Sequence, residues 1–250
     1  MRIELKTFKN KNDSNYGSHR SEFTVAVMSL DYKNSELDKN IFLSILERAE
    51  KLAKAVNPHS ANNPAKIRTQ SNLVVNNFIG MISEYAWKYF INLSAIDITV
   101  TETEMKDVAN QIDLIQIRTG KTIEVRSSFV TNGISFAIFN QKGFDIIGPY
   151  INDIYKLSEI EKDFYLRTLI HYDNKRIQNF FEYFKNNVLN IYLVGGATKE
   201  MMSDENLFII KHMKAGEIIG NRDSINVTTY KAIPIIKAKD AIQIKECIAK

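Results

Sequence analysis

The sequence predicts an α/β protein with a mixed central sheet flanked by helices. Three observations carry this prediction. Two short β-like runs joined by a tight turn lie within Gln111 to Phe129, a helical apolar pattern precedes them at Leu73 to Phe90, and a helical pattern and then a strand follow them, up to Val194. Helices that alternate with strands in this way are typical of α/β folds. We expect a single domain over residues 1–250, with its core at about 73–197.

The composition is that of a mildly basic globular protein. Hydrophobic residues make up 44% and charged residues 25% of the 250 residues, and the formal net charge is +4. This charge allows a nucleic-acid partner without requiring one. The only cysteine, Cys247, excludes an internal disulfide framework and a cysteine-rich zinc site, and it fits a reducing compartment. No apolar run approaches the roughly 18 residues of a membrane span, so we expect a cytoplasmic protein with no membrane partner.

Residues 1–72 are predicted to form a helical elaboration of the core. Met1 to Arg20 are polar, which indicates a loop, and Glu22 to Leu30 is a strand candidate. Ser35, with acids after it, can cap a helix that reaches Val56. The basic residues of this helix lie on a face that is either solvated or in contact with DNA. Its apolar stripe consists of Leu37, Ile41, Ile45, Leu52 and Val56.

A loop of about sixteen residues, Asn57 to Asn72, follows this helix and contains two prolines and four asparagines. Loops of this length are often functional. Asn and Gln side chains can pair with adenine edges, while Lys and Arg bind phosphates. Lys66 and Arg68 are therefore candidate DNA contacts, and the alternative is a plain surface connector.

The helix predicted at Leu73 to Phe90 has one apolar face. At roughly 100° per residue, Glu84 lies at the border of that face. It is therefore either an acid placed next to a site or a solvated helix acid. The face itself is formed by Val74, Phe78, Met81, Ile82, Tyr85, Ala86 and Tyr89.

A β-hairpin follows, after a strand predicted at Ser94 to Thr101. Ile112 to Ile117 is rich in strand-forming residues, and the pattern resumes at Thr122. Between these runs, Arg118 to Lys121 forms the turn, in which Gly120 can adopt a positive φ.

Two carboxylates and a cation are expected to meet on this hairpin. Asp113 near the start of one strand can converge with Glu124 on the return strand. Alternation places Arg126 on the face of Glu124 and Val125 on the opposite face. Mg²⁺ takes oxygen ligands from one or two carboxylates, so the pair predicts a magnesium site. The alternative is a surface hairpin whose acids form a weak ion pair with Arg126.

The chain beyond the hairpin is predicted to continue the α/β pattern. Asp145 is an isolated acid for which we expect a structural role at a strand end. The pair Gly195-Gly196 ends the last strand and matches neither phosphate-loop glycine pattern, so a nucleotide-binding Rossmann fold is the weaker interpretation. The predicted elements are β-like runs at Ile134 to Phe139 and Phe144 to Ile147, the latter ended by Gly148-Pro149, helices at Glu159 to Leu169 and Asn174 to Asn187, and a strand at Asn190 to Val194.

Residues 198–250 are predicted to form a basic, β-rich elaboration. β-like runs occupy Leu207 to Ile210 and Ile225 to Ile236, and a further segment spans Ala241 to Cys247. The clustered lysines suit either a lobe that contacts phosphates or a solvated strand edge guarded by lysines.

The hairpin resembles the signature of the PD-(D/E)xK nuclease superfamily, most closely that of type II restriction endonucleases. That signature is an acid, a short hairpin and then acid-x-lysine on the next strand; here it is Asp113 followed by Glu124-Val125-Arg126. Ile112 stands where the family usually has proline, and Arg126 stands where it usually has lysine. The order helix, three strands, helix, strand from about Leu73 to Ala197 is the αβββαβ order of that family's core.

The resemblance implies a Mg²⁺-dependent, sequence-specific endonuclease in which a metal-activated water hydrolyses double-stranded DNA. Asp113 and Glu124 would bind the metal together with the backbone carbonyl of Val125. Glu84 would be an auxiliary acid. Arg126 stays protonated, so it would orient the nucleophile or neutralise phosphate charge rather than act as a base.

The resemblance also implies partners. Restriction-like enzymes often act on two-fold sites as dimers, so a homodimer is expected. The alternative is a nucleic-acid-binding or assembly protein that keeps the nuclease fold without cleaving, and Arg126 is the feature that favours it. Candidate DNA contacts near the hairpin are Lys121, Ser127, Ser128 and Asn132.

Overall fold

The fold is described from a computed structural model, which covers two sheets and the helices around them. The structure describes residues 2–10, 20–55, 69–93, 99–102, 112–139, 144–152, 160–213 and 228–250. The strands of the central sheet are β1 (Arg2–Lys9), β2 (Glu22–Leu30), β3 (Val100–Glu102), β4 (Leu114–Gln116), β5 (Thr122–Val130), β7 (Phe164–His171), β8 (Leu189–Thr198) and β11 (Lys239–Asp240). The second sheet consists of β6 (Ile146–Asn152), β9 (Ile209–Met213) and β10 (Thr228–Ile233).

Helices lie around both sheets. The α-helices are α1 (Glu36–Ala55), α2 (Gln70–Asn92), α3 (Ile134–Phe139), α4 (Phe180–Asn186) and α5 (Ala241–Ala249). Short 3₁₀ turns are η2 (Asn174–Asn179), η3 (Met201–Ser203) and η4 (Ile235–Lys237). None of the helices that the structure describes has both the length and the apolar composition needed to cross a bilayer.

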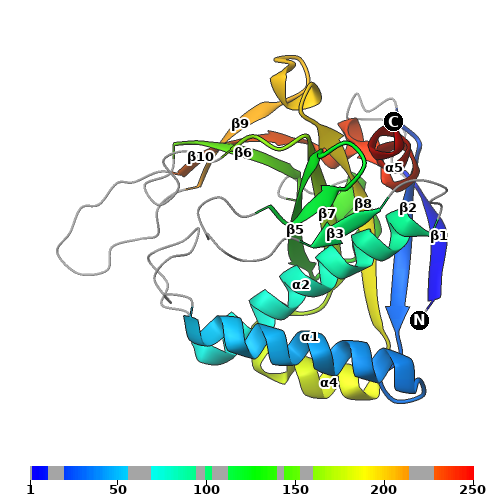
Figure 1. Cartoon of the computed structure of the whole chain (residues 1–250). Helices are drawn as coiled ribbons and strands as arrows, with labels where there is room; N and C mark the ends of the chain where they lie inside the picture. Colours follow the sequence, from blue (N-terminus) through cyan, green and yellow to red (C-terminus); the bar gives the residue numbers. More distant parts are fainter. Residues whose placement is uncertain are drawn as a thin grey trace.

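The central sheet is mixed, as the sequence predicts. Its strand order is β1-β2-β8-β7-β5-β4-β3, with β11 paired to β8, and the second sheet has the order β6-β10-β9. β5 and β7 are parallel, and the other described pairs of the central sheet are antiparallel. The α/β class is therefore confirmed. Figure 1 shows the second sheet at the end of the molecule away from α1 and α4.

Each face of the central sheet has its own apolar core. The helical face is covered by α1, α2, α4 and α5, and its core contains Ile123 and Val125 of β5 together with Leu166 of β7. The opposite face is covered by α3, the second sheet and the turns η3 and η4, and its core contains Tyr165 and Leu169 of β7. Because side chains alternate along a strand, this second face also bears Arg126 of β5 and Arg167 of β7. We call it the arginine face, after Arg126 and Arg167.

The N-terminal residues are strands as well as a helix, which corrects the prediction of a helical elaboration over residues 1–72. β2 spans the predicted residues, but the polar start of the chain, predicted to be a loop, forms β1. It pairs with β2 from Arg2↔Ser29 to Lys9↔Glu22. The open edge of β2 supplies backbone partners for β1, and no hydrophobic periodicity is needed for such pairing.

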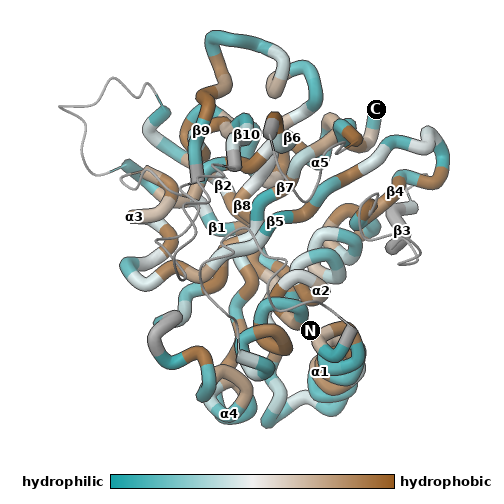
Figure 2. The backbone as a smooth tube through the Cα atoms, turned by 90° about the vertical axis from the view of Figure 1, so that its left-hand side faces the viewer, coloured by the Kyte–Doolittle hydropathy of each residue, from teal (hydrophilic) through white to brown (hydrophobic). Residues whose placement is uncertain are grey.

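The helix α1 confirms the predicted helix but not its apolar stripe. The Ser35 hydroxyl accepts a hydrogen bond from Asp38 N at 3.2 Å, which caps the first turn. Leu37, predicted for the stripe, is 60% exposed, while Phe42 and Ala49 are buried beside Ile45. The buried stripe is therefore rotated around the helix axis relative to the predicted one. Figure 2 shows hydrophilic and hydrophobic positions around α1.

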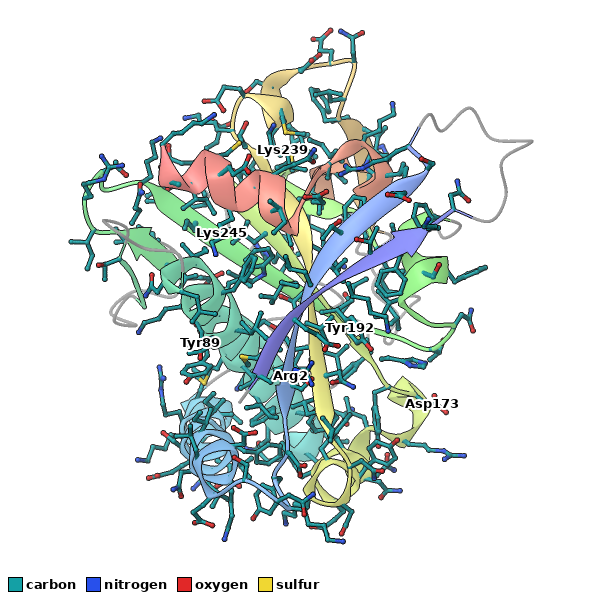
Figure 3. The ribbon with its side chains drawn as sticks, turned by 90° about the vertical axis from the view of Figure 1, so that its right-hand side faces the viewer. Arg2, Tyr89, Asp173, Tyr192, Lys239 and Lys245 are labelled. Carbon is teal, nitrogen blue, oxygen red and sulfur yellow. The ribbon has the colours of Figure 1, made fainter. Side chains whose placement is uncertain are left out.

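The helix α2 is confirmed and is buried over a wider arc than the sequence predicts. Phe78, Ile82 and Ala86 are buried as expected, and Trp87 is completely buried. Val74, Tyr85 and Tyr89 are only half-buried. α2 packs against both the sheet and α1, so two sides of the helix are covered. The C-terminal end of α2 is also bound to α5, because Lys245 Nζ donates to Phe90 O at 2.8 Å. Lys245 is labelled in Figure 3.

Several predictions after the hairpin are wrong. Ile134–Phe139 is the helix α3 rather than a strand, because Ile134, Ala137 and Ile138 bury one side at helical spacing. The predicted helix at Glu159 to Leu169 is largely the strand β7, whose first seven residues are all buried. A strand covered on both faces has no alternation, so its apolar run resembles that of a buried helix.

The strand predicted at Phe144 to Ile147 is found, but with shifted ends and in a different sheet. It is part of β6, which continues through Gly148-Pro149 and belongs to the second sheet rather than extending the central one. β6 lies at the edge of its sheet, where proline is tolerated. The helix predicted at Asn174 to Asn187 is found as η2 followed by α4.

The C-terminal part is less β-rich than predicted. Ala241 to Ala249 form α5, and its buried Ile244 and Ile248 join the core of the helical face. β8 also continues beyond the predicted end at Gly195-Gly196. Gly195 has a φ of 145°, and a Cβ there would lie 2.1 Å from Lys239 O, so the glycine lets β11 approach β8. A packing role therefore accounts for the glycine pair.

Candidate functional site

The predicted hairpin is present and consists of β4 and β5. The two strands pair in antiparallel register, with Leu114 opposite Ile123. Gly120 in the turn has a φ of 70°, the left-handed conformation expected from the sequence. Its N–H donates to Gln116 O at 2.8 Å, which closes the turn.

Asp113 and Glu124 lie on the same face of this hairpin. Continuing the register by one residue places Asp113 opposite Glu124, and Leu114 beside it is buried on the helical face. Asp113 Oδ2 accepts a hydrogen bond from Val125 N at 2.7 Å. This bond holds the aspartate against the backbone next to Glu124, so both carboxylates belong to the arginine face.

Glu124 and Arg126 form an ion pair, as alternation predicts. Arg126 Nη2 lies 2.7 Å from Glu124 Oε1, and the two side chains are 19% and 8% exposed. Val125 between them is buried in the core of the helical face. The pair is shielded from solvent on most sides, so the Coulombic attraction between its charges is screened less than in an exposed pair of the same length.

A second arginine, Arg167, lies next to Arg126. The parallel register of β5 and β7 makes the two residues direct neighbours. Arg167 is 2% exposed, and its Nη2 donates to Ser128 Oγ at 2.9 Å. Burial, and then the charge of Arg126, lower the pKa of Arg167 to about 10. The guanidinium is still protonated at neutral pH, so the arginine face holds two adjacent cations.

The second sheet contributes aromatic and charged residues above these arginines. Arg126 lies over the ring of Tyr150 in β6, with 5.3 Å between the guanidinium carbon and the ring centroid. The rings of Tyr150 and Tyr230 are 6.0 Å apart. Asp145, which precedes β6, is 7% exposed and forms an ion pair with Lys211 of β9. The structural role expected for Asp145 is consistent with this pairing.

Glu84 belongs to a different element from this group. It belongs to α2, which packs on the helical face, whereas Glu124 and Arg126 belong to the arginine face. Its side chain is half-buried. The structure therefore brings Asp113, Glu124 and Arg126 together and places Glu84 in the helix behind the sheet.

The candidate DNA contacts are spread over several places. Lys121 is half-buried, with its Nζ 5.7 Å from the centroid of the Phe164 ring. By alternation, Ser127 points toward the helical face, and Ser128 binds Arg167 on the arginine face. Asn132 is exposed just after β5. The other two candidates, Lys66 and Arg68, lie outside the described residues.

The donor atoms on the hairpin fit a hard cation. Asp113 and Glu124 supply carboxylate oxygens, which Mg²⁺ prefers, and each carboxylate offers about four lone-pair positions. Asp113 can therefore keep its bond to Val125 N while it coordinates a cation. No group of three or more His, Cys, Asp or Glu side chains suited to a metal occurs within the described ranges. Any Mg²⁺ here would complete its coordination with waters and substrate oxygens.

The sequence pattern does not mark Arg167 as a site residue. Its segment, Phe-Tyr-Leu-Arg-Thr-Leu-Ile, was predicted to be helical, where an arginine is ordinary. In a strand buried on both faces, a lone arginine is unusual, because charged side chains are almost never fully buried. The signal was present in the residues but depended on the correct secondary structure.

Comparison with known proteins adds no relative. No protein-family model, no curated protein and no solved structure matches the chain. Membership of the PD-(D/E)xK superfamily therefore stays a prediction that depends on the hairpin motif and its geometry.

Proposed function

We propose that the protein is a Mg²⁺-dependent endonuclease that cleaves double-stranded DNA in the manner of type II restriction enzymes. The observation that supports it best is the placement of Asp113 and Glu124 at opposing positions on one face of the β4–β5 hairpin. Arg126 adds a cation 2.7 Å from Glu124 on that face. Two acids and a neighbouring cation are what metal-assisted hydrolysis of a phosphodiester requires.

The roles of the residues follow from their chemistry. Asp113 and Glu124, with the Val125 carbonyl, would hold Mg²⁺, which when bound supplies Lewis-acid activation of water and neutralises phosphate charge. Asp113 is held in place by its bond to Val125 N. Arg126 remains protonated, so it stabilises negative charge on the phosphate instead of removing a proton. The Glu124–Arg126 ion pair keeps this cation in position before substrate binds.

The proposed substrate and assembly come from the resemblance. A sequence-specific enzyme of this kind would bind duplex DNA as a two-fold homodimer, one active site for each strand. Light scattering on the purified protein, alone and with a duplex, measures this directly. A monomer in both conditions would contradict the dimer without affecting the nuclease proposal.

Digestion of supercoiled plasmid tests the activity. With Mg²⁺ we expect nicked and then linear products, and with EDTA we expect none. Asp113→Asn should not cleave, whereas Glu182→Gln, at an exposed surface pair with Lys185, should cleave at the wild-type rate. Cleavage by wild-type protein in EDTA, or full activity of Asp113→Asn, would contradict the metal assignment.

A second function is favoured by a specific feature, the Arg126 side chain that replaces the usual lysine and engages Glu124. A protein with this pair can bind nucleic acid through its cations without cleaving it. In that case the wild type binds duplex DNA but does not cut it with Mg²⁺ or Mn²⁺, and Arg126→Lys gains cleavage. Cleavage by the wild type would exclude this alternative.

A further inference from the structure

Arg167 has more hydrogen-bonding capacity than the surrounding protein uses. Its Nη2 donates to Ser128 Oγ, but Nε and Nη1 are buried and have no hydrogen-bond partner among the described residues. A guanidinium carries five N–H donors in a planar fork. Buried donors without partners are rare in folded proteins, and a bound ion is one of the explanations for them.

The carboxylates near Arg167 are bound to other groups. Arg126 is its neighbour across the parallel pair, and Glu124 is bound to Arg126. Asp145 favours the charged form of Arg167 but is itself paired with Lys211. Among the described residues, no carboxylate forms an ion pair with Arg167, because Glu124 is bound to Arg126, Asp145 is bound to Lys211, and Asp113 accepts a hydrogen bond from Val125 N. Two adjacent arginines repel each other unless an anion lies between them.

We infer that Arg167, Arg126 and the Ser128 hydroxyl form a binding site for a phosphate group, and that its ligand is a phosphodiester of the DNA backbone. Two planar guanidinium groups and a hydroxyl match the several oxygens of a phosphate, which arginine binds in bidentate fashion. The choice of DNA as ligand rests on the proposed function, whereas the anion site rests on Arg167 alone.

The exposure of the two arginines indicates from which side a ligand would enter the site. Arg126 is 19% exposed in its side chain and Arg167 is 2% exposed as a residue, so a phosphate would meet Arg126 first and Arg167 behind it. Arg167 would then touch the substrate next to the phosphate that Asp113 and Glu124 act on. The site therefore positions the backbone and needs no metal.

Thermal unfolding in EDTA tests the anion site without any cleavage. Inorganic phosphate, compared with chloride at matched ionic strength, should raise the wild-type Tm by about 5 °C at roughly 100 times Kd. Arg167→Met, which keeps the side-chain length and removes the donors, should show no rise. The control Arg176→Met removes an exposed arginine and should keep the full rise. An absent rise in the wild type, or a rise retained by Arg167→Met, would overturn the site.

Two further variants keep the test valid if Arg167→Met does not fold. Arg167→Lys retains the charge but not the bidentate fork, so at least half of the phosphate-dependent rise should be lost. Ser128→Ala removes only the hydroxyl and should lower the rise by a smaller amount. Wild-type behaviour of both folded variants would contradict the proposed contacts.

Binding of a fluorescent duplex in EDTA identifies the ligand. Arg167→Met should weaken the binding at least tenfold, and inorganic phosphate should compete with the duplex for wild-type protein but not for the variant. Stabilisation by phosphate with unchanged duplex affinity in Arg167→Met would overturn DNA as the ligand. If the wild type cuts DNA but shows neither stabilisation by phosphate nor competition between phosphate and the duplex, the phosphate site is refuted and the nuclease proposal is not. Both effects without cleavage would support the site and refute the nuclease.

Discussion

The two faces of the central sheet use polar residues in opposite ways. On the helical face, two buried side chains of the sheet and α2 have partners within the fold: Trp87 Nε1 donates to Thr168 Oγ1 at 3.1 Å, and Gln116 Nε2 donates to Ile248 O at 2.7 Å. On the arginine face, Arg167 is fully buried with two nitrogens that the described residues leave without a partner.

Under the proposed function, this difference separates residues that stabilise the fold from residues that bind a ligand along the same strands. Thr168 and Arg167 are consecutive residues of β7, yet one completes a packed core and the other keeps a buried charge. Burial lowers the pKa of Arg167, so holding this charge inside the protein weakens the folded state. The arginine face is therefore where a ligand is expected, and the helical face is the scaffold.

The largest expected effect is the loss of cleavage when either carboxylate of the arginine face is neutralised. Glu124→Gln and Asp113→Asn should each reduce the rate on the order of 10³-fold, because each removes a metal ligand. The Tm should change little for Asp113→Asn, whereas Glu124→Gln should also lower it, because Arg126 loses its ion-pair partner. Plasmid cleavage and circular dichroism measure the two quantities. Nicking at the original rate by either folded variant would place the chemistry elsewhere.

The helical face should respond in stability and not in chemistry. Ile82→Ala, in the fully buried centre of α2, should lower the free energy of unfolding by 2–5 kcal/mol, or the Tm by about 10 °C. Cleavage per folded molecule should be unchanged. The matched control Leu37→Ala, at an exposed position of α1, should leave the Tm almost unchanged. A lower cleavage rate per folded molecule for Ile82→Ala would contradict the assignment of the helical face to stability alone.

Charge at position 126 should matter more than basicity. Arg126→Gln should lose on the order of 10²-fold in rate, as removal of one preorganised donor typically does. Arg126→Lys should retain substantial activity, because an ammonium supplies the same charge. Rate measurements on both variants decide this. Equal loss in both would mean that the guanidinium geometry, rather than its charge, is required.

The smallest effect is expected at Glu84, which α2 holds on the helical face. Glu84→Gln should change the cleavage rate less than about threefold and leave its Mg²⁺ dependence in place, because α2 packs on the helical face whereas Glu124 and Arg126 belong to the arginine face. Titration of the rate with Mg²⁺ is the measurement. A loss of tenfold or more, or a raised Mg²⁺ requirement, would return Glu84 to the auxiliary role implied by the resemblance.

The strands and helices that the sequence predicted correctly have strong local signals. β2 has its predicted ends, and α1 and α2 begin and end near theirs, because their periodicity and the Ser35 cap are local. The predictions that failed concern short apolar segments, such as Ile134–Phe139 and Phe164–His171. In such segments the partner surface decides between helix and strand, and that surface comes from distant residues.

The sequence by itself determined the hairpin, its Gly120 turn and the placement of Glu124 and Arg126 on one face. These depend on alternation and turn chemistry over fewer than about twenty residues. Only the tertiary structure decided that Arg167 lies beside Arg126, although the two residues are 41 positions apart in the sequence. A parallel pair needs a crossover connection, so its register is set by the packing of the whole sheet rather than by any local pattern. The same packing buried Arg167 and placed Glu84 behind the sheet.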